Sequence, residues 1–130
     1  MTQLSKITYI SNAGVLIESG DNKILVDGLC DSKIPMYKNT PRKLREQIIA
    51  GIPPFDDINF LLFTHDHGDH FDPVSIARFL KQYNNAVMLA NQISIWEVRK
   101  LLKNFKYDKW IDSSSPFWKG KEYPNEWDRY

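Results

Sequence analysis

All three histidines of the chain, His65, His67 and His70, lie in the single stretch LLFTHDHGDHFDP, with Asp66 and Asp69 interleaved between them. Neutral imidazole and carboxylate groups are ligands that zinc and similar divalent ions take in proteins. Histidines two residues apart project to the same side of an extended backbone, so His65 and His67 suit one ion. Groups crowded this closely repel or desolvate one another unless a cation holds them. The stretch therefore predicts a metal site.

The second half of this stretch suits a further ligand pair. Asp69 and His70 are adjacent, and in an extended strand their side chains would point in opposite directions. Gly68 permits a sharp turn that could re-aim both. Such a pair fits a two-metal site, in which two ions about 3.5–4 Å apart share one hydroxide. The alternative, a polar surface loop without metal, is the usual interpretation of a single histidine.

The histidines follow a predicted strand and precede a predicted helix. The apolar run INFLLFT, residues 58–64, indicates a strand buried on both faces. Asp72-Pro73 predicts an N-cap and first helical turn. The carboxyl end of a strand in an open α/β sheet is where ligands usually bind. The position of the cluster in the chain therefore agrees with its chemistry.

The remaining segments predict an α/β domain with a mixed sheet and flanking helices. Residues 6–10, 14–18 and 23–27 are β-branched runs separated by turns, which indicates an antiparallel meander. Residues 86–90 predict a second buried strand. Thr40 and Pro41, as N-cap and first turn, and Gly51, as the stop, mark a first helix. Asn91 caps a last helix, whose apolar stripe is Ile95, Val98, Leu102 and Phe105.

The composition of the chain limits which classes of function are expected. The chain has 130 residues, 42% hydrophobic and 25% charged, which is typical of one globular domain. A formal charge of +1 favours neither nucleic acid nor an anionic membrane as partner. Cys30 is the only cysteine, so no internal disulfide forms. With no signal-peptide pattern and no run of about 20 apolar residues, we expect a cytoplasmic protein.

The pattern changes near the end of the chain. We predict a domain over residues 1–112 and an irregular, aromatic-rich tail over residues 113–130, SSSPFWKGKEYPNEWDRY. The tail has two prolines and no apolar period, and Trp118 or Trp127 could dock it onto the domain.

THDHGDH, residues 64–70, matches the T-H-x-H-x-D-H signature of the metallo-β-lactamase-fold hydrolases. The opening ITYISNAGVLIESGDNKILVDG, which ends near Asp27, resembles the first three strands of that superfamily. The resemblance that these two stretches carry extends over most of residues 6–105. The resemblance implies an αββα sandwich made of two similar βα halves, of which this chain carries only the N-terminal half. Asn12-Ala13 departs from the family, which often has a histidine-alanine pair there.

The resemblance also implies roles for the cluster. His65 and His67 would bind a first ion, and Asp69 and His70 a second. Asp66 lies near the metals in the family, so Asp69 and Asp66 are the catalytic candidates. The cofactor would be one or two Zn²⁺ ions, with Mn²⁺ or Fe²⁺ also possible. The metal would activate water against a small-molecule ester, thioester, lactone, lactam or phosphodiester.

Two residues outside the cluster complete the predicted site. Asp27 resembles the family carboxylate that orients a metal-binding histidine. A turn residue at the end of a strand is an equally good interpretation of Asp27. Thr64 opens the signature and is expected to support the ligands.

The match ends where the second half of the family fold would begin. No histidine follows His70, whereas the family takes further ligands from its second half. We therefore expect a truncated domain that self-associates or takes its missing ligands from a second chain. Two further hypotheses are a non-catalytic metal-binding remnant and an interaction module that uses the tail.

Overall fold

The computed structural model describes residues 5–11, 14–30, 40–64 and 71–113. These residues form a six-stranded mixed sheet and three helices, which confirms the predicted α/β class. The strands are β1 (Ser5–Ser11), β2 (Gly14–Ser19), β3 (Asn22–Val26), β4 (Phe60–Leu62), β5 (Val87–Ala90) and β6 (Trp110–Asp112). The helices are α1 (Arg42–Ala50), α2 (Pro73–Gln82) and α3 (Gln92–Leu101).

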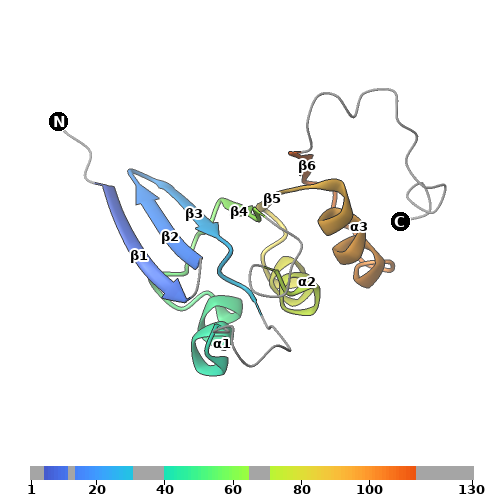
Figure 1. The fold of residues 1–130 in the computed structure, drawn as a ribbon. Helices are drawn as coiled ribbons and strands as arrows, with labels where there is room; N and C mark the ends of the chain where they lie inside the picture. Colours follow the sequence, from blue (N-terminus) through green and yellow to red (C-terminus); the bar gives the residue numbers. More distant parts are fainter. Residues whose placement is uncertain (1–4, 12–13, 31–39, 65–70, 114–130) are drawn as a thin grey trace.

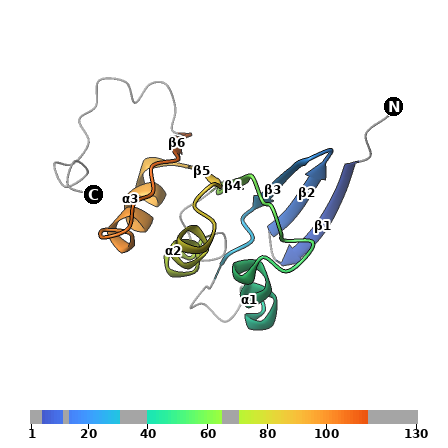
Figure 2. The ribbon, with the colours of Figure 1, turned by 180° about the vertical axis from the view of Figure 1, so that it is seen from behind.

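The strand order in space is the order along the chain, β1-β2-β3-β4-β5-β6. β1, β2 and β3 pair antiparallel, which confirms the predicted meander, and β3 to β6 pair parallel. Each parallel connection passes through one helix and steps in the same direction across the sheet. Right-handed crossovers that all step in one direction put their helices on one face. Figures 1 and 2 show α1, α2 and α3 side by side along that face.

The core lies between the helices and one face of the sheet. Leu16, Leu25, Leu61 and Met88 are register partners across β2 to β5, and each has no exposed surface. Helices α2 and α3 cover this row with Ile76, Phe79, Leu80, Ile95 and Val98, all nearly inaccessible to solvent.

The prediction that residues 58–64 and 86–90 form strands buried on both faces is wrong for β4 and β5. Phe60, Leu62, Val87 and Leu89 alternate with the core row and are only half-buried. Their side of the sheet is covered by none of the described helices. β4 is also shorter than the apolar run: the strand is Phe60–Leu62, and Asn59 and Phe63 on either side of it still make backbone hydrogen bonds to Lys23 and Leu89.

Helix termini follow the predicted capping chemistry at three places. The Asp72 side chain accepts a hydrogen bond from Ser75 N, and Asn91 accepts one from Ser94 N at 2.8 Å. Gly51 ends α1 in the left-handed conformation, with φ 69°.

Thr40 does not cap α1, contrary to the prediction. The N-cap position is Pro41, which has no side-chain cap bond. The Thr40 hydroxyl instead donates to Gly28 O at 2.8 Å, and Thr40 is buried. The buried Gly28 carbonyl, just after β3, thus takes the Thr40 hydroxyl that was expected to cap α1.

Strand β6 was not predicted, because three residues are too few to show a pattern. Tyr107 explains its position: its hydroxyl donates to Ala86 O at 2.5 Å and accepts from Met88 N at 3.0 Å. The Trp110 ring lies edge-on to Tyr107, with centroids 4.6 Å apart. The predicted tail, apart from Ser113, and Asn12-Ala13 lie outside the described residues. Within the described chain no helix has the length and apolar run that crossing a bilayer requires.

Candidate metal centre

The five candidate metal-site residues, His65, Asp66, His67, Asp69 and His70, lie outside the described residues. The structure describes the residues on both sides of this segment, here called the histidine segment (residues 65–70), and the strand end beside it. It therefore shows how the two ends of the segment are held.

Asp27 holds the entry to the histidine segment. It follows β3, is 1% exposed, and has a left-handed backbone with φ 49°, which Asp adopts more readily than most residues. Its backbone N donates to Leu62 O at 2.9 Å. Its carboxylate accepts from Thr64 N at 2.9 Å and from the Thr64 hydroxyl at 2.5 Å. These two donors offset the cost of burying the carboxylate.

Both interpretations of Asp27 describe part of this geometry. Asp27 is a strand-end residue in a left-handed conformation, and its carboxylate also orients the residue directly before His65. Its predicted effect on a histidine ring stays a prediction, because those rings lie outside the described residues. Thr64 donates to this carboxylate from both its backbone N and its hydroxyl, and its predicted support of the metal ligands likewise stays a prediction.

The exit of the histidine segment is held as firmly. Phe71 is 4% exposed and lies edge-on to Phe63, with ring centroids 5.4 Å apart. Asp72 N donates to Leu29 O at 2.8 Å. The Asp72 carboxylate accepts from Ser75 N at 3.2 Å and from the Ser75 hydroxyl at the start of α2. Both ends of the segment are therefore tied to the stretch that follows β3.

That stretch, residues 27–30, is tightly packed, and sequence reasoning missed this. A Cβ on Gly28 would lie 2.5 Å from Leu25 Cδ1, so the fully buried Leu25 side chain would have to shift to admit one. Cys30 is fully buried, with its Sγ 3.3 Å from the Thr40 hydroxyl. The adjacent Asp27-Gly28 pair at a strand end was the available signal.

Among the described residues, the groups with clearly shifted pKa values lie elsewhere in the fold. Bidentate hydrogen bonds from Arg78 hold the pKa of Glu46 below its usual value, joining α1 to α2 at 2.8 Å. A hydrogen bond from Lys23 lowers the pKa of Asp56. Burial raises the pKa of Tyr107 beside β5 and β6.

The donor set of the histidine segment fits a divalent ion, with three imidazoles and two carboxylates in six residues. Among the residues with described positions, no three His, Cys, Asp or Glu side chains come together as a metal site. A centre with three such ligands would therefore need at least one ligand from outside the described residues, and residues 65–70 are the densest group of donors there.

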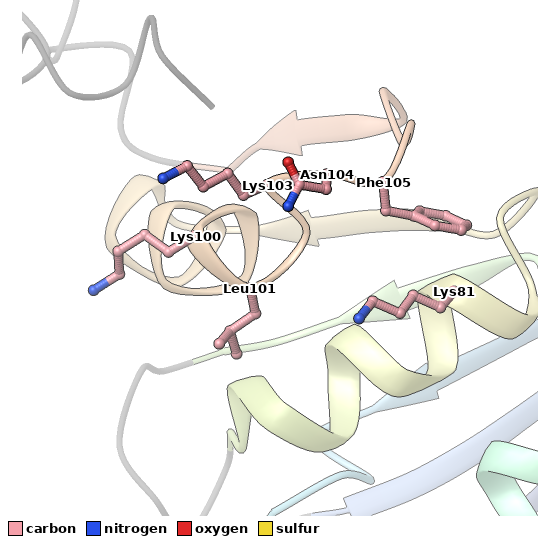
Figure 3. Close-up of a pocket in the computed structure, with 6 residues that line it drawn as sticks. All are labelled: Lys81, Lys100, Leu101, Lys103, Asn104 and Phe105. Carbon is pink, nitrogen blue, oxygen red and sulfur yellow. The ribbon is translucent and has the colours of Figure 1, made fainter.

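Two surface hollows of the described residues lie away from this end of the sheet. The larger, of about 540 Å³, is at the carboxyl ends of α2 and α3 (Figure 3). Its lining is Lys81, Lys100, Leu101, Lys103, Asn104 and Phe105. Lysines near helix carboxyl ends interact favourably with the helix dipole, which accounts for them without a ligand. The smaller, of about 360 Å³, includes Asn22, Asn59 and Val87 at the amino ends of β3 to β5.

Comparisons with known proteins leave the family open. No family model matches the chain. A curated protein of Mycolicibacterium smegmatis (strain ATCC 700084 / mc(2)155), named "Putative Rieske 2Fe-2S iron-sulfur protein", is 25% identical over 109 residues. The match covers 84% of this chain and 20% of that protein, so the chain spans about one fifth of its relative's length.

A solved structure is also similar. The crystal structure of a "Putative metal-dependent hydrolase" from Parabacteroides distasonis ATCC 8503 has a TM-score of 0.48 and 23% identity. The similarity covers 74% of this chain and 35% of that chain. At this TM-score neither fold nor function follows from the likeness.

A Rieske cluster does not fit the residues of this chain. Such a cluster takes two cysteines and two histidines. The chain has one cysteine, and Cys30 is fully buried beside Thr40. The imidazole and carboxylate donors of the histidine segment suit a site for one or two divalent ions instead.

Proposed function

We propose that this chain carries the metal-binding part of a metal-dependent hydrolase of the metallo-β-lactamase type. The observation that carries the proposal is the placement of the histidine segment. It starts after Thr64, which the buried Asp27 carboxylate holds. It ends before Phe71, which packs against Phe63, and Asp72, which bonds Leu29 after β3. Ligands on a segment with both ends fixed lose less conformational entropy on binding a metal.

Four residues would hold the metal, His65 and His67 at one position and Asp69 and His70 at another. The bound Zn²⁺, or Mn²⁺ or Fe²⁺, would supply Lewis acidity and lower the pKa of water for attack on an ester, thioester, lactone, lactam or phosphodiester. Asp27 would orient the ligands by fixing the backbone at Thr64. Asp66 would lie beside the reacting centre, where a carboxylate can accept a proton.

The ligand count makes this chain one part of a complete site. Catalytic zinc usually takes three protein ligands, whereas the proposed pairs supply two each. The remaining ligands would come from a longer protein, a second copy or another chain. Small-molecule hydrolysis by the 130-residue chain itself is therefore expected to be weak.

The test is metal stoichiometry measured together with turnover. The purified chain is stripped with a chelator and titrated with Zn²⁺, Mn²⁺ or Fe²⁺, with bound metal counted by native mass spectrometry. We expect one or two ions per chain, and binding weakened at least tenfold in His65→Ala and His67→Ala. Asp21→Ala is the matched control, because Asp21 is an exposed carboxylate in the β2–β3 turn.

The outcomes separate the hypotheses. Binding that is lost in the histidine variants, with turnover of a chromogenic ester, lactam or phosphodiester, supports the hydrolase. The same binding without turnover of any of these supports a metal-binding remnant. Equal binding by all variants contradicts a metal site in the histidine segment, and the interaction module then becomes the better hypothesis.

A further inference from the structure

One face of the sheet carries two continuous rows of apolar side chains. Strand register places them in line across the described strands. We call these two rows the open face. The first row is Ile7, Ile17, Ile24, Phe60 and Val87, and the second is Tyr9, Val15, Val26, Leu62, Leu89 and Ile111.

The open face has no formal charge at any strand position. Its next row is Ser5, Ser19 and Asn22, which is polar and neutral. The charged residues of the same strands lie on the opposite, helix-covered side. Lys23, for example, bonds Asp56 and Pro54 O in the loop after α1. Charge therefore gives this face no preference for nucleic acid or an anionic membrane.

None of the described helices covers the open face, since all three crossovers place their helices on the other side (Figures 1 and 2). Its outermost residues are the most exposed: Ile7 is 70%, Tyr9 65% and Ile111 47% exposed. Parallel strands are normally covered on both faces, because an uncovered face leaves apolar side chains in water.

We propose that the open face packs against the open face of a second copy of this chain. Strands about 4.8 Å apart and two same-face rows deep make a patch on the order of 400 Å² in projection. The largest apolar patch of a typical soluble monomer is of this size and is often functional. A standard interface buries about 800 Å² per partner. The apolar patch would supply the core of such an interface, and the surrounding residues, including the neutral row of Ser5, Ser19 and Asn22, would supply the rest of the area. We therefore expect a reversible dimer with a micromolar dissociation constant.

A second copy fits this face because its shape and twist are the same. Two sheets of equal right-handed twist pack face to face with their strands about 30° apart. A twofold axis brings the same patch to both sides of the interface, so apolar rows meet apolar rows. No strand position on the face places like charges opposite each other.

The chain's own C-terminal residues are a poorer cover. Residues 114–130 include two prolines and six charged side chains. A single extended segment covers a strip about 5 Å wide, whereas the described strands span about 24 Å. A single extended segment would therefore cover only part of the open face, whereas a second sheet would cover both rows.

Sedimentation velocity on the full chain over a wide micromolar range tests the proposal without metal. We expect the average mass to rise from monomer to dimer with concentration. Ile17→Lys, in the middle of a row, should hold the chain monomeric and shift the dissociation constant at least a hundredfold. Ile7→Lys, at an exposed edge position, provides the same test if Ile17→Lys does not fold.

Val74→Lys and Ile93→Lys are the matched controls, because both residues are exposed and apolar but lie on α2 and α3. They should dimerise like the unmodified chain. A chain that is monomeric at every concentration overturns the proposal. So does a dimer that persists in both open-face variants, or one that forms only after residues 114–130 are deleted. None of these results depends on whether the histidine segment binds metal.

Discussion

At the scale of single residues, the structure concentrates its unusual geometry in residues 27–30. Asp27 combines a left-handed backbone with a buried carboxylate, and Gly28 packs where a Cβ would make the Leu25 side chain shift. Both features stabilise the place from which the histidine segment leaves the sheet. Their effects can be measured without any ligand.

Thr64→Val should lower the free energy of unfolding by about 1–3 kcal/mol, because it removes a hydroxyl donor to the buried Asp27 carboxylate. Thr64→Ser keeps that hydroxyl and should lose less than about 0.5 kcal/mol. Urea denaturation of both variants makes the comparison. Equal losses would mean that the hydroxyl bond contributes nothing to stability.

Gly28→Ala should cost about 1–3 kcal/mol, because the new methyl group would overlap the fully buried Leu25 side chain. A double-mutant cycle with Leu25→Ala tests the cause. Removing the Leu25 side-chain atoms should relieve the overlap. The double variant should therefore lose less stability than the sum of the losses in the two single variants. If the double variant loses the sum of the two single losses, the cost of Gly28→Ala does not come from overlap with Leu25.

At the scale of elements, two helix caps have the same chemistry in different places. Asp72 caps α2 at the exit of the histidine segment, and Asn91 caps α3 after β5. Asp72→Ala and Asn91→Ala should each lower the free energy of unfolding by about 1 kcal/mol. Only Asp72→Ala should also weaken metal binding, measured by titration of the stripped protein. Equal weakening in both variants would show that cap position does not matter.

Tyr107 makes the β5–β6 edge sensitive to alkaline pH. Burial raises its pKa above the value near 10 of an unfolded tyrosine. The folded chain thus keeps a proton that the unfolded chain has lost, so this contribution to stability is complete below pH about 10 and falls as pH rises further. Tyr107→Phe should be less stable at neutral pH and should lose less stability between neutral and alkaline pH. Denaturation midpoints across that range measure both effects, and parallel pH profiles would contradict the assignment.

The elements that the sequence predicted correctly are those with local signals. The β-branched runs, Asp72-Pro73, Asn91 and Gly51 each carry their own cap or strand pattern, and the structure confirms them. The features that the sequence predicted wrongly or missed depend on residues far away in the chain. Thr40 bonds Gly28 instead of α1, β6 depends on Tyr107, and β4 and β5 are covered on one face because every crossover steps in the same direction. No local pattern encodes these choices.

At the scale of the whole molecule, the described sheet separates the two proposed functions, metal binding and dimerisation, in space. Its helix-covered side holds the core, and its carboxyl-end edge holds both ends of the histidine segment. The open face remains for a partner. The candidate metal site was predicted from six residues of sequence, because metal ligands are chemically distinctive, and it stays a prediction. The open face emerged only from strand register and the direction of the crossovers.

Metal binding should stabilise the whole fold, because the ends of the histidine segment are bonded to Asp27 and to Leu29 after β3. A ligand that binds only the native state, at a free concentration of 100 times its dissociation constant, adds about 2.7 kcal/mol to the free energy of unfolding. Zn²⁺ should therefore raise the thermal midpoint of the stripped chain, and a chelator should reverse the rise. His65→Ala should abolish the effect and Asp21→Ala should preserve it, as followed by circular dichroism. Stabilisation of equal size in His65→Ala would mean that zinc acts at another site, and the proposed centre would have to be abandoned.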